Sequence, residues 1–336
     1  MKEKDIRLTS TEMGALWATY VNDTMARCVL SYFHHIVEDS EITSVVKYAL
    51  DLSDKQIQEL TKIFNAEDFP IPKGFSDEDV NVNVKRLFSD SFFLYYIKNM
   101  AKVGLVTYSM TYTMASRSDI RSFFHDTLLK TVKLDQKVTE VLQSKGLYIR
   151  PPYMPIPDGI DFVENKNFLS GGFFGFLDKR PLISIEIAHL FANAQTNGLG
   201  KTMLMGFNQV ARSQEIRKYF SRGVDISTKH VKIFADILKD DELPVPMTWD
   251  SDVMDSTEAP FSDKLMLYHV SLLIAAGTGN YGIATAASPR RDVAANYIRL
   301  AAEIASYAED GAKMLIEHGW LEEPPQAPDR KELMKT

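Results

Sequence analysis

A few carboxylates and histidines at helical spacing are the residues of this chain that could hold a metal. Glu186-Ile-Ala-His189 places a carboxylate and an imidazole three residues apart, on one face of a helix. His269 lies in a later apolar segment. A di-metal centre in a helical bundle needs one Glu from each of two helices and a Glu-x-x-His pair from each of the others. Glu186, His189 and His269 are the candidate ligands, but the set is incomplete, so we expect no metal and no other cofactor.

Glu186 also has a simpler interpretation. It would lie in the first turn of a helix, where a carboxylate stabilises the positive end of the helix dipole and accepts hydrogen bonds from free amide groups. Glu12 occupies the same position in an earlier segment. We therefore expect both carboxylates to cap helices.

A second set of candidates pairs a glycine with a tyrosine four residues later: Gly104 with Tyr108, and Gly277 with Tyr281. This spacing puts both members on one helix face, and a helical glycine costs about 1 kcal/mol relative to alanine, which implies a packing reason. One interpretation is a close helix crossing beside a buried tyrosine. The other is an apolar pocket in which these four residues bind a ligand. Residues 277–282 also fit G-x-G-x-x-G, but a dinucleotide site would require a preceding strand.

These positions recur because the chain contains an internal duplication. LTSTEMGAL from Leu8 reappears as LISIEIAHL from Leu182, an offset of 174 residues. After a one-residue slip, Phe88-Ser89-Asp90 reappears as Phe261-Ser262-Asp263, an offset of 173. A repeat of this length indicates duplicated structural units. We predict two homologous domains, residues 1–164 and 182–336, joined by a Gly/Phe-rich junction at 165–181.

Each copy has the apolar periodicity of four helices, and no strand is expected. In the second copy we expect helices near 183–212, 214–240, 262–288 and 290–318. In the first, the third helix begins at Ser89-Asp90, and Gly146 should form a left-handed cap after the fourth. Short breaks within helix pairs and a link of about twenty residues between the pairs predict two hairpins joined by a crossover. The fold class is therefore all-α, with two tandem ferritin-like four-helix bundles.

The junction carries glycines among large aromatic side chains: Phe168, Phe173, Phe174 and Phe176. We expect these rings to plug a groove between the bundles, because isolated exposed aromatics are uncommon. The alternative is a loop that docks on a partner.

The composition excludes some classes of function. The 336 residues are 45% hydrophobic and 25% charged, as in ordinary globular proteins, and the net charge is −7. Because no long Lys/Arg cluster is present, nucleic acid is not an expected partner. The polar opening MKEKDIRLTS and the lack of a long apolar run predict a cytoplasmic protein without a membrane span.

The paired motifs LTSTEM and LISIEI, FPIP and LPVP, and the junction FLSGGFFGFLDKRPL support a family resemblance. The chain resembles an uncharacterised family of tandem ferritin-like proteins from endospore-forming bacteria, which is distantly similar to Coat F type spore coat proteins. The resemblance covers nearly the whole chain. It implies the fold and a sporulation context, and it brings no catalytic residues.

Three hypotheses follow. The first is a non-enzymatic structural or interaction protein that associates with itself or with spore coat proteins. The second is a binding module for a hydrophobic small molecule in a bundle interior. The third is a degenerate di-metal oxidoreductase. The sequence favours a non-enzymatic role, because no nucleophile with a positioned base can be identified.

Overall fold

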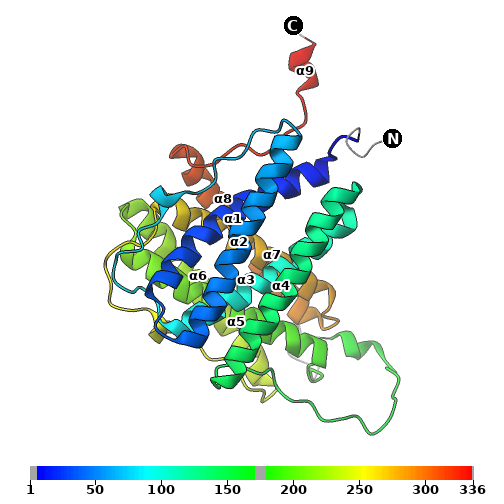
Figure 1. Cartoon of the computed structure of the whole chain (residues 1–336). Helices are drawn as coiled ribbons and strands as arrows, with labels where there is room; N and C mark the ends of the chain where they lie inside the picture. The colour runs from blue at the N-terminus through cyan, green and yellow to red at the C-terminus, as the bar shows by residue number, and fades with distance from the viewer. Residues whose placement is uncertain (1–5, 171–178, 335–336) are drawn as a thin grey trace. The chain divides into compact units, whose positions relative to one another are not determined.

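The computed structural model describes residues 6–170 and 179–334, and Figure 1 traces their helices and loops. Within these residues, the long helices are α1 (Ser10–Ile36), α2 (Ser40–Ala66), α3 (Asp90–Met114), α4 (Ser118–Ser144), α5 (Ser184–Val210), α6 (Gln214–Asp240), α7 (Asp263–Ala286) and α8 (Arg291–Glu317). Short elements are η2 (Asp77–Asp79), η3 (Lys166–Leu169), η4 (Asp250–Asp252) and α9 (Arg330–Leu333). One isolated antiparallel bridge joins Phe88 to Val253 in the described part of the chain. The all-α prediction and the positions of the helices are confirmed.

Local residues define where the helices begin and end. The side chains of Thr9 and Asp39 accept hydrogen bonds from first-turn amide groups of α1 and α2, as N-capping residues do. After α4, Gly146 has a φ of +67°, and after α8 Gly319 has a φ of +66°. Glycine adopts this left-handed conformation without a steric penalty, so the predicted cap at Gly146 is confirmed.

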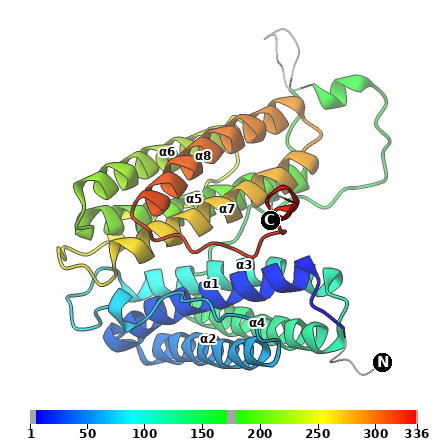
Figure 2. The same ribbon diagram turned by 90° about the horizontal axis from the view of Figure 1, so that it is seen from above.

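The first compact unit comprises Met1–Val82, Ile97–Val141 and Gly319–Thr336. In it, α1 packs on α2, and α2 and α4 run side by side (Figure 2). The Lys98 ammonium lies 2.7 Å from the Asp135 carboxylate, which ties α3 to α4. The core includes a cluster of buried side chains from three of these helices and the α3–α4 turn: Leu16, Leu60, Phe64, Ala115, Ile120 and Phe124.

The second compact unit comprises Asn83–Tyr96 and Leu142–His318. Its helices form a four-helix bundle, in which α5 contacts α6 and α7, and α8 contacts the same two helices (Figure 2). These two units are defined by the contacts within the folded chain. The predicted domains, 1–164 and 182–336, are defined by the sequence repeat instead, and they stay a prediction.

Two tyrosines lock α6 to α8 in the second unit. The Tyr219 hydroxyl donates to the Tyr307 carbonyl oxygen (3.1 Å), and the Tyr307 hydroxyl donates to the Tyr219 carbonyl oxygen (3.0 Å). The two rings stack with centroids 4.2 Å apart. The hydroxyl end of each tyrosine also packs against a glycine on the facing helix. A Cβ at Gly223 would collide with the Tyr307 hydroxyl, and a Cβ at Gly311 would collide with the Tyr219 hydroxyl. Both glycines are therefore required by this close approach.

Among residues 6–170 and 179–334, no helix combines the length and apolar character needed to span a bilayer.

Candidate functional site

A chain of polar side chains crosses the interior of the second unit near the middle of its helices. Asn197 of α5, His230 of α6, Tyr281 of α7 and Glu303 of α8 each contribute one group. The Tyr281 hydroxyl lies 2.8 Å from His230 Nδ1 and 2.8 Å from Asn197 Nδ2. His230 Nε2 lies 3.2 Å from the Glu303 carboxylate. All four helices therefore converge on one hydrogen-bonded cluster, which we call the 281 cluster.

The hydrogen bonds of the 281 cluster define its protonation state. Asn197 Nδ2 donates to the Tyr281 oxygen, so the Tyr281 hydroxyl donates its proton to His230 Nδ1, and the single imidazole proton lies on Nε2 and is donated to Glu303. Burial lowers the pKa of His230, although Glu303 partly offsets this effect. Burial also raises the pKa of Tyr281. At neutral pH the inner groups are therefore uncharged, and the charge lies at the rim, where Lys229 Nζ is 2.8 Å from Glu303.

The first unit has a related cluster at the repeat-equivalent positions Asp23, Gln56 and Tyr108. The Gln56 amide nitrogen faces both Asp23 carboxylate oxygens at 2.8 and 2.9 Å. Burial raises the pKa of Asp23, and burial together with Asp23 raises the pKa of Tyr108. The repeat-equivalent positions thus hold a tyrosine in both copies, with Asp23 and Gln56 in the first copy where the second has Asn197 and His230.

Replacing Tyr281 with phenylalanine removes one hydroxyl that serves two partners. We expect Tyr281→Phe to lower the free energy of unfolding by about 1 to 3 kcal/mol, because Asn197 and His230 each lose a buried hydrogen bond. Urea unfolding followed by circular dichroism measures this loss. The exposed Tyr153→Phe is the matched control and should change stability by less than about 0.5 kcal/mol. Equal stability of the two variants would contradict the proposed energetic role of the 281 cluster.

At the end of the second bundle, a buried carboxylate forms a clasp that joins the start of α5 to the start of α8. Glu186 is fully buried and accepts two hydrogen bonds from the Arg180 guanidinium, both 2.8 Å, and one from the Arg290 amide at 2.9 Å. Arg290, 1% exposed, pairs in turn with Asp292 at 2.9 Å and Asp241 at 3.7 Å. Burial opposes ionisation, but the hydrogen bonds hold the pKa of Glu186 below its usual value.

The same clasp is present in the first copy with different donors. Glu12 accepts hydrogen bonds from the amide and hydroxyl groups of Thr9 and Ser116 and from the Arg117 amide. Burial opposes ionisation, but these donors lower the pKa of Glu12 to about 2. The capping interpretation of Glu12 and Glu186 is confirmed, and both carboxylates additionally tie distant helices together.

The structure does not bring the three candidate metal ligands together. Glu186 is in the first turn of α5, whereas His269 lies beside Phe207 near the end of that helix, with ring centroids 5.9 Å apart. About twenty helical residues separate these ends, a distance of about 30 Å. His269 Nε2 is 3.3 Å from the Tyr96 hydroxyl, and His189 is half-buried on α5. Among the described residues, no group of three or more His, Cys, Asp or Glu side chains could hold a metal ion.

The two glycine–tyrosine pairs differ in packing. A Cβ at Gly104 would lie 3.1 Å from the Tyr108 ring and 3.2 Å from Thr131, so the helix crossing there is close. A Cβ at Gly277 would make only an ordinary 3.7 Å contact with Ile304. Tyr281 belongs to the 281 cluster. Ligand binding by Gly104, Tyr108, Gly277 and Tyr281 stays a prediction.

Sequence reasoning missed three members of the 281 cluster: Asn197, His230 and Glu303. One signal was available, because His230 falls on the buried stripe of α6, four residues before Phe234. A histidine on such a stripe needs a polar partner from a neighbouring helix. The sequence could not say which helix supplies it.

An open pocket of about 400 Å³ lies in the second unit between α5, α6 and the segment 250–253. It is lined by both polar and apolar side chains: Met205, Asn208, Gln209, Ser221, Val224, Asp250 and Val253. Its volume is within the range of small-molecule sites. The pocket does not include the residues of the predicted ligand site.

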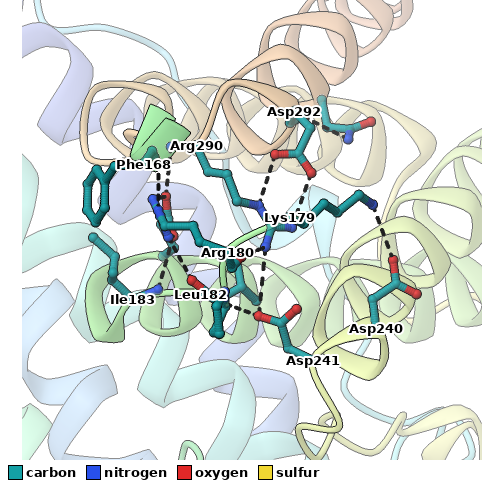
Figure 3. Close-up of polar contacts among 12 residues, drawn as sticks. Phe168, Lys179, Arg180, Leu182, Ile183, Asp240, Asp241, Arg290 and Asp292 are labelled. Atoms are coloured by element: carbon teal, nitrogen blue, oxygen red, sulfur yellow. Dashed lines mark hydrogen bonds and ion pairs between the residues drawn. The ribbon is translucent and has the colours of Figure 1, made fainter. Parts of the chain in front are cut away.

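The aromatic junction is described only in part. The Arg180 guanidinium lies over the Phe168 ring, 4.2 Å from its centroid (Figure 3). Phe173, Phe174 and Phe176 lie outside the described residues, so the choice between a plug and a docking loop stays a prediction.

His269 should make stability depend on pH. Burial lowers its pKa from 6.5 to about 4, so the folded state prefers the neutral ring while the unfolded chain takes up a proton. The contribution of the neutral His269 ring to the free energy of unfolding is fully present above pH 6.5. It decreases by about 1.4 kcal/mol per pH unit as the pH drops towards 4, a total of about 3 kcal/mol. In His269→Phe, which keeps a ring against Phe207, the slope of unfolding free energy between pH 6.5 and 4.5 should be much shallower. An unchanged slope in urea titrations would contradict this assignment.

A known protein family matches nearly the whole chain, and one solved structure is similar to about half of it. A family described as "Protein of unknown function (DUF3231)" matches residues 1–160 and 171–333. A crystal structure of a "putative spore coat protein" from Bacillus halodurans C-125 is similar at 18% identity and a TM-score of 0.42. The similarity covers 46% of this chain and 100% of that chain. No curated protein matches.

Proposed function

This chain belongs to the DUF3231 family of proteins of unknown function, and for it we propose the role of a non-enzymatic helical scaffold. In this proposal the protein acts by associating with itself or with other proteins of a spore-related assembly. Each tandem bundle provides a rigid body whose helices are tied at the ends by a buried carboxylate clasp. A ferritin-like ancestry and a cytoplasmic site of action belong to the same proposal.

The observation that carries this proposal is that the polar groups of the 281 cluster are hydrogen-bonded to one another. Active sites direct a nucleophile, a base or hydrogen-bond donors at a position that the substrate can occupy. In the 281 cluster, both nitrogens of His230 and the hydroxyl of Tyr281 are already engaged by neighbouring side chains. The arrangement supports a structural role, in which a buried polar network specifies how four helices pack.

Exposed apolar side chains further support an interaction role. Val106, Met110 and Met114 follow one another at intervals of four along α3 and are 52%, 60% and 55% exposed. A spacing of four places them on one helix face. Large apolar side chains grouped on a surface are typical of protein interaction sites.

The spore context comes from the resemblance of the repeated motifs to the tandem family of endospore-forming bacteria. Its test is a gene deletion together with an epitope-tagged copy in an endospore-forming host. We expect the tagged protein in extracts of purified spores, and we expect the deletion to change spore protein composition or resistance. Unchanged spores, with the tagged protein confined to the cytoplasmic fraction, would rule out this part of the proposal.

A binding module for a small molecule is the second candidate function, favoured by the 400 Å³ pocket beside Asp250. One carboxylate oxygen of Asp250 is buried and has no hydrogen-bond partner among the described residues, while the other lies 2.6 Å from Lys201 Nζ. Native mass spectrometry of the purified full chain tests this function. A retained mass that disappears in Val224→Trp would support it, and the bare chain mass throughout would remove it.

A further inference from the structure

The segment that follows α4 exposes large apolar side chains along an extended stretch of chain. Residues 151–164 contain no helix or strand. Five of their side chains are largely in solvent: Tyr153 at 84%, Ile156 at 91%, Ile160 at 91%, Phe162 at 89% and Val163 at 61%. Such a concentration of exposed apolar surface marks an interaction site.

The chemistry of this segment restricts what could bind it. Residues 151–165 carry three carboxylates, Asp158, Asp161 and Glu164, and no lysine or arginine. An anionic lipid surface attracts basic segments, so it would repel this one. Four prolines between 151 and 157 favour an extended backbone, which reduces the entropy lost on docking. The segment therefore fits a surface that combines apolar contacts with positive charge.

The outer face of α4 has this combination. Leu129 and Val132 are 55% and 47% exposed, and Lys130 and Lys133 beside them are exposed. The nearby carboxylate of Asp135 is already paired with Lys98 at 2.7 Å. We call Leu129, Lys130, Val132 and Lys133 the α4 face.

The second copy does not repeat the α4 face. Its equivalent positions on α8 carry small or acidic side chains, namely Ala302, Glu303, Ala305 and Ser306. Glu303 is moreover engaged by Lys229 and His230. The basic, apolar α4 face is therefore a feature of the first copy that the equivalent positions of α8 lack.

We propose that residues 153–164 of one copy dock on the α4 face of a second copy of this chain. Ile156, Ile160 and Phe162 would cover Leu129 and Val132, while Asp158 and Asp161 pair with Lys130 and Lys133. The inference rests on the proposed scaffold function and names the partner and both surfaces. Two copies that exchange their segments reciprocally form a closed dimer, whereas a one-way contact repeated from copy to copy gives rings or open chains of molecules.

Charge reversal tests this pairing with the full chain. In analytical ultracentrifugation at low salt, we expect the wild type to exceed its monomer mass of 38.0 kDa as the concentration rises. D158K/D161K and K130E/K133E should each weaken association by about tenfold or more. The combination of all four reversals restores opposite charges and should return association towards the wild-type level.

A matched control separates specific pairing from net charge. K55E/K218E reverses two exposed lysines on α2 and α6 and changes the net charge by the same amount as K130E/K133E. We expect K55E/K218E to associate like the wild type, and its combination with D158K/D161K not to restore association. Circular dichroism melting of every variant confirms that each is folded.

Two results would overturn the inference. A wild type that stays monomeric at all concentrations would exclude the second copy as the occupant, and it would leave the scaffold proposal dependent on other proteins. Self-association that is insensitive to the reversals, or a quadruple variant that is not rescued, would retain the scaffold function and exclude these two surfaces.

Discussion

The variant Arg180→Ile is expected to lose about 3 to 5 kcal/mol of unfolding free energy, because it removes the cation that faces a fully buried carboxylate. The side chain of Arg180 is 13% exposed and gives Glu186 two hydrogen bonds of 2.8 Å. Without it, Glu186 would keep the Arg290 and Ile183 amides as its partners. Two backbone donors do not replace a bidentate guanidinium next to a buried charge.

The first copy shows why isoleucine is compatible with a buried glutamate at position 6 but not at position 180. Ile6 occupies the position equivalent to Arg180, and Glu12 instead receives hydrogen bonds from the Thr9 hydroxyl (2.8 Å) and from the amide and hydroxyl of Ser116 (2.8 and 3.1 Å). In the second copy the equivalent residues are Ile183 and Pro289. Isoleucine has no hydroxyl, and proline lacks both a hydroxyl and an amide proton. Arg180 compensates for these missing donors.

Urea unfolding of matched variants measures the effect. Lys179→Ile is the control, since Lys179 neighbours Arg180, is 45% exposed and lies 3.7 Å from Asp240, so it should change stability by less than about 0.5 kcal/mol (Figure 3). Adding I183T and P289S to Arg180→Ile supplies the donors of the first copy and should recover part of the loss. A loss below about 1 kcal/mol for Arg180→Ile, or no recovery in the triple variant, would contradict this account.

Gly223→Ala is expected to lower the free energy of unfolding by about 1 to 3 kcal/mol, because the new methyl group would collide with the Tyr307 phenol. The sign should reverse when the tyrosine is removed. In the first copy, the equivalent of Gly223 is Ala49, and the equivalent of Tyr307 is Leu134. Both are buried, so alanine and leucine are compatible at these positions. In a Tyr307→Leu background, Gly223→Ala should therefore stabilise by up to about 1 kcal/mol, the helix propensity of alanine over glycine.

A double-mutant cycle tests the reversal, with urea unfolding of all four combinations. Gly282→Ala on α7 is the control, because a Cβ at Gly282 meets no atom within 4 Å. It should stabilise in both backgrounds. If Gly223→Ala destabilised equally with and without Tyr307, steric contact with the phenol would not be the reason for glycine at this position.

The sequence predicted features that depend on neighbours along the chain. Helix periodicity, the capping role of Glu12 and the left-handed Gly146 were all recognisable, because they act within a turn or two of one helix. Partners outside the helix itself were not predicted: Glu186 was expected to cap α5, but its pairing with Arg180, in the segment before α5, and its contact with Arg290, at the start of α8, were not foreseen.

The sequence by itself determined the duplication, the all-helical fold class and the positions of the helices. The offsets of 174 and 173 residues and the 3.6-residue period depend only on the spacing of residues along the chain. The tertiary structure decided which polar groups meet. His230 is 51 residues from Tyr281 and 73 from Glu303, yet it contacts both. It also decided that the side chains of Ile156 and Phe162 are exposed within a single chain. Burial and pairing depend on how helices pack in space, and periodicity defines only the face that each helix presents.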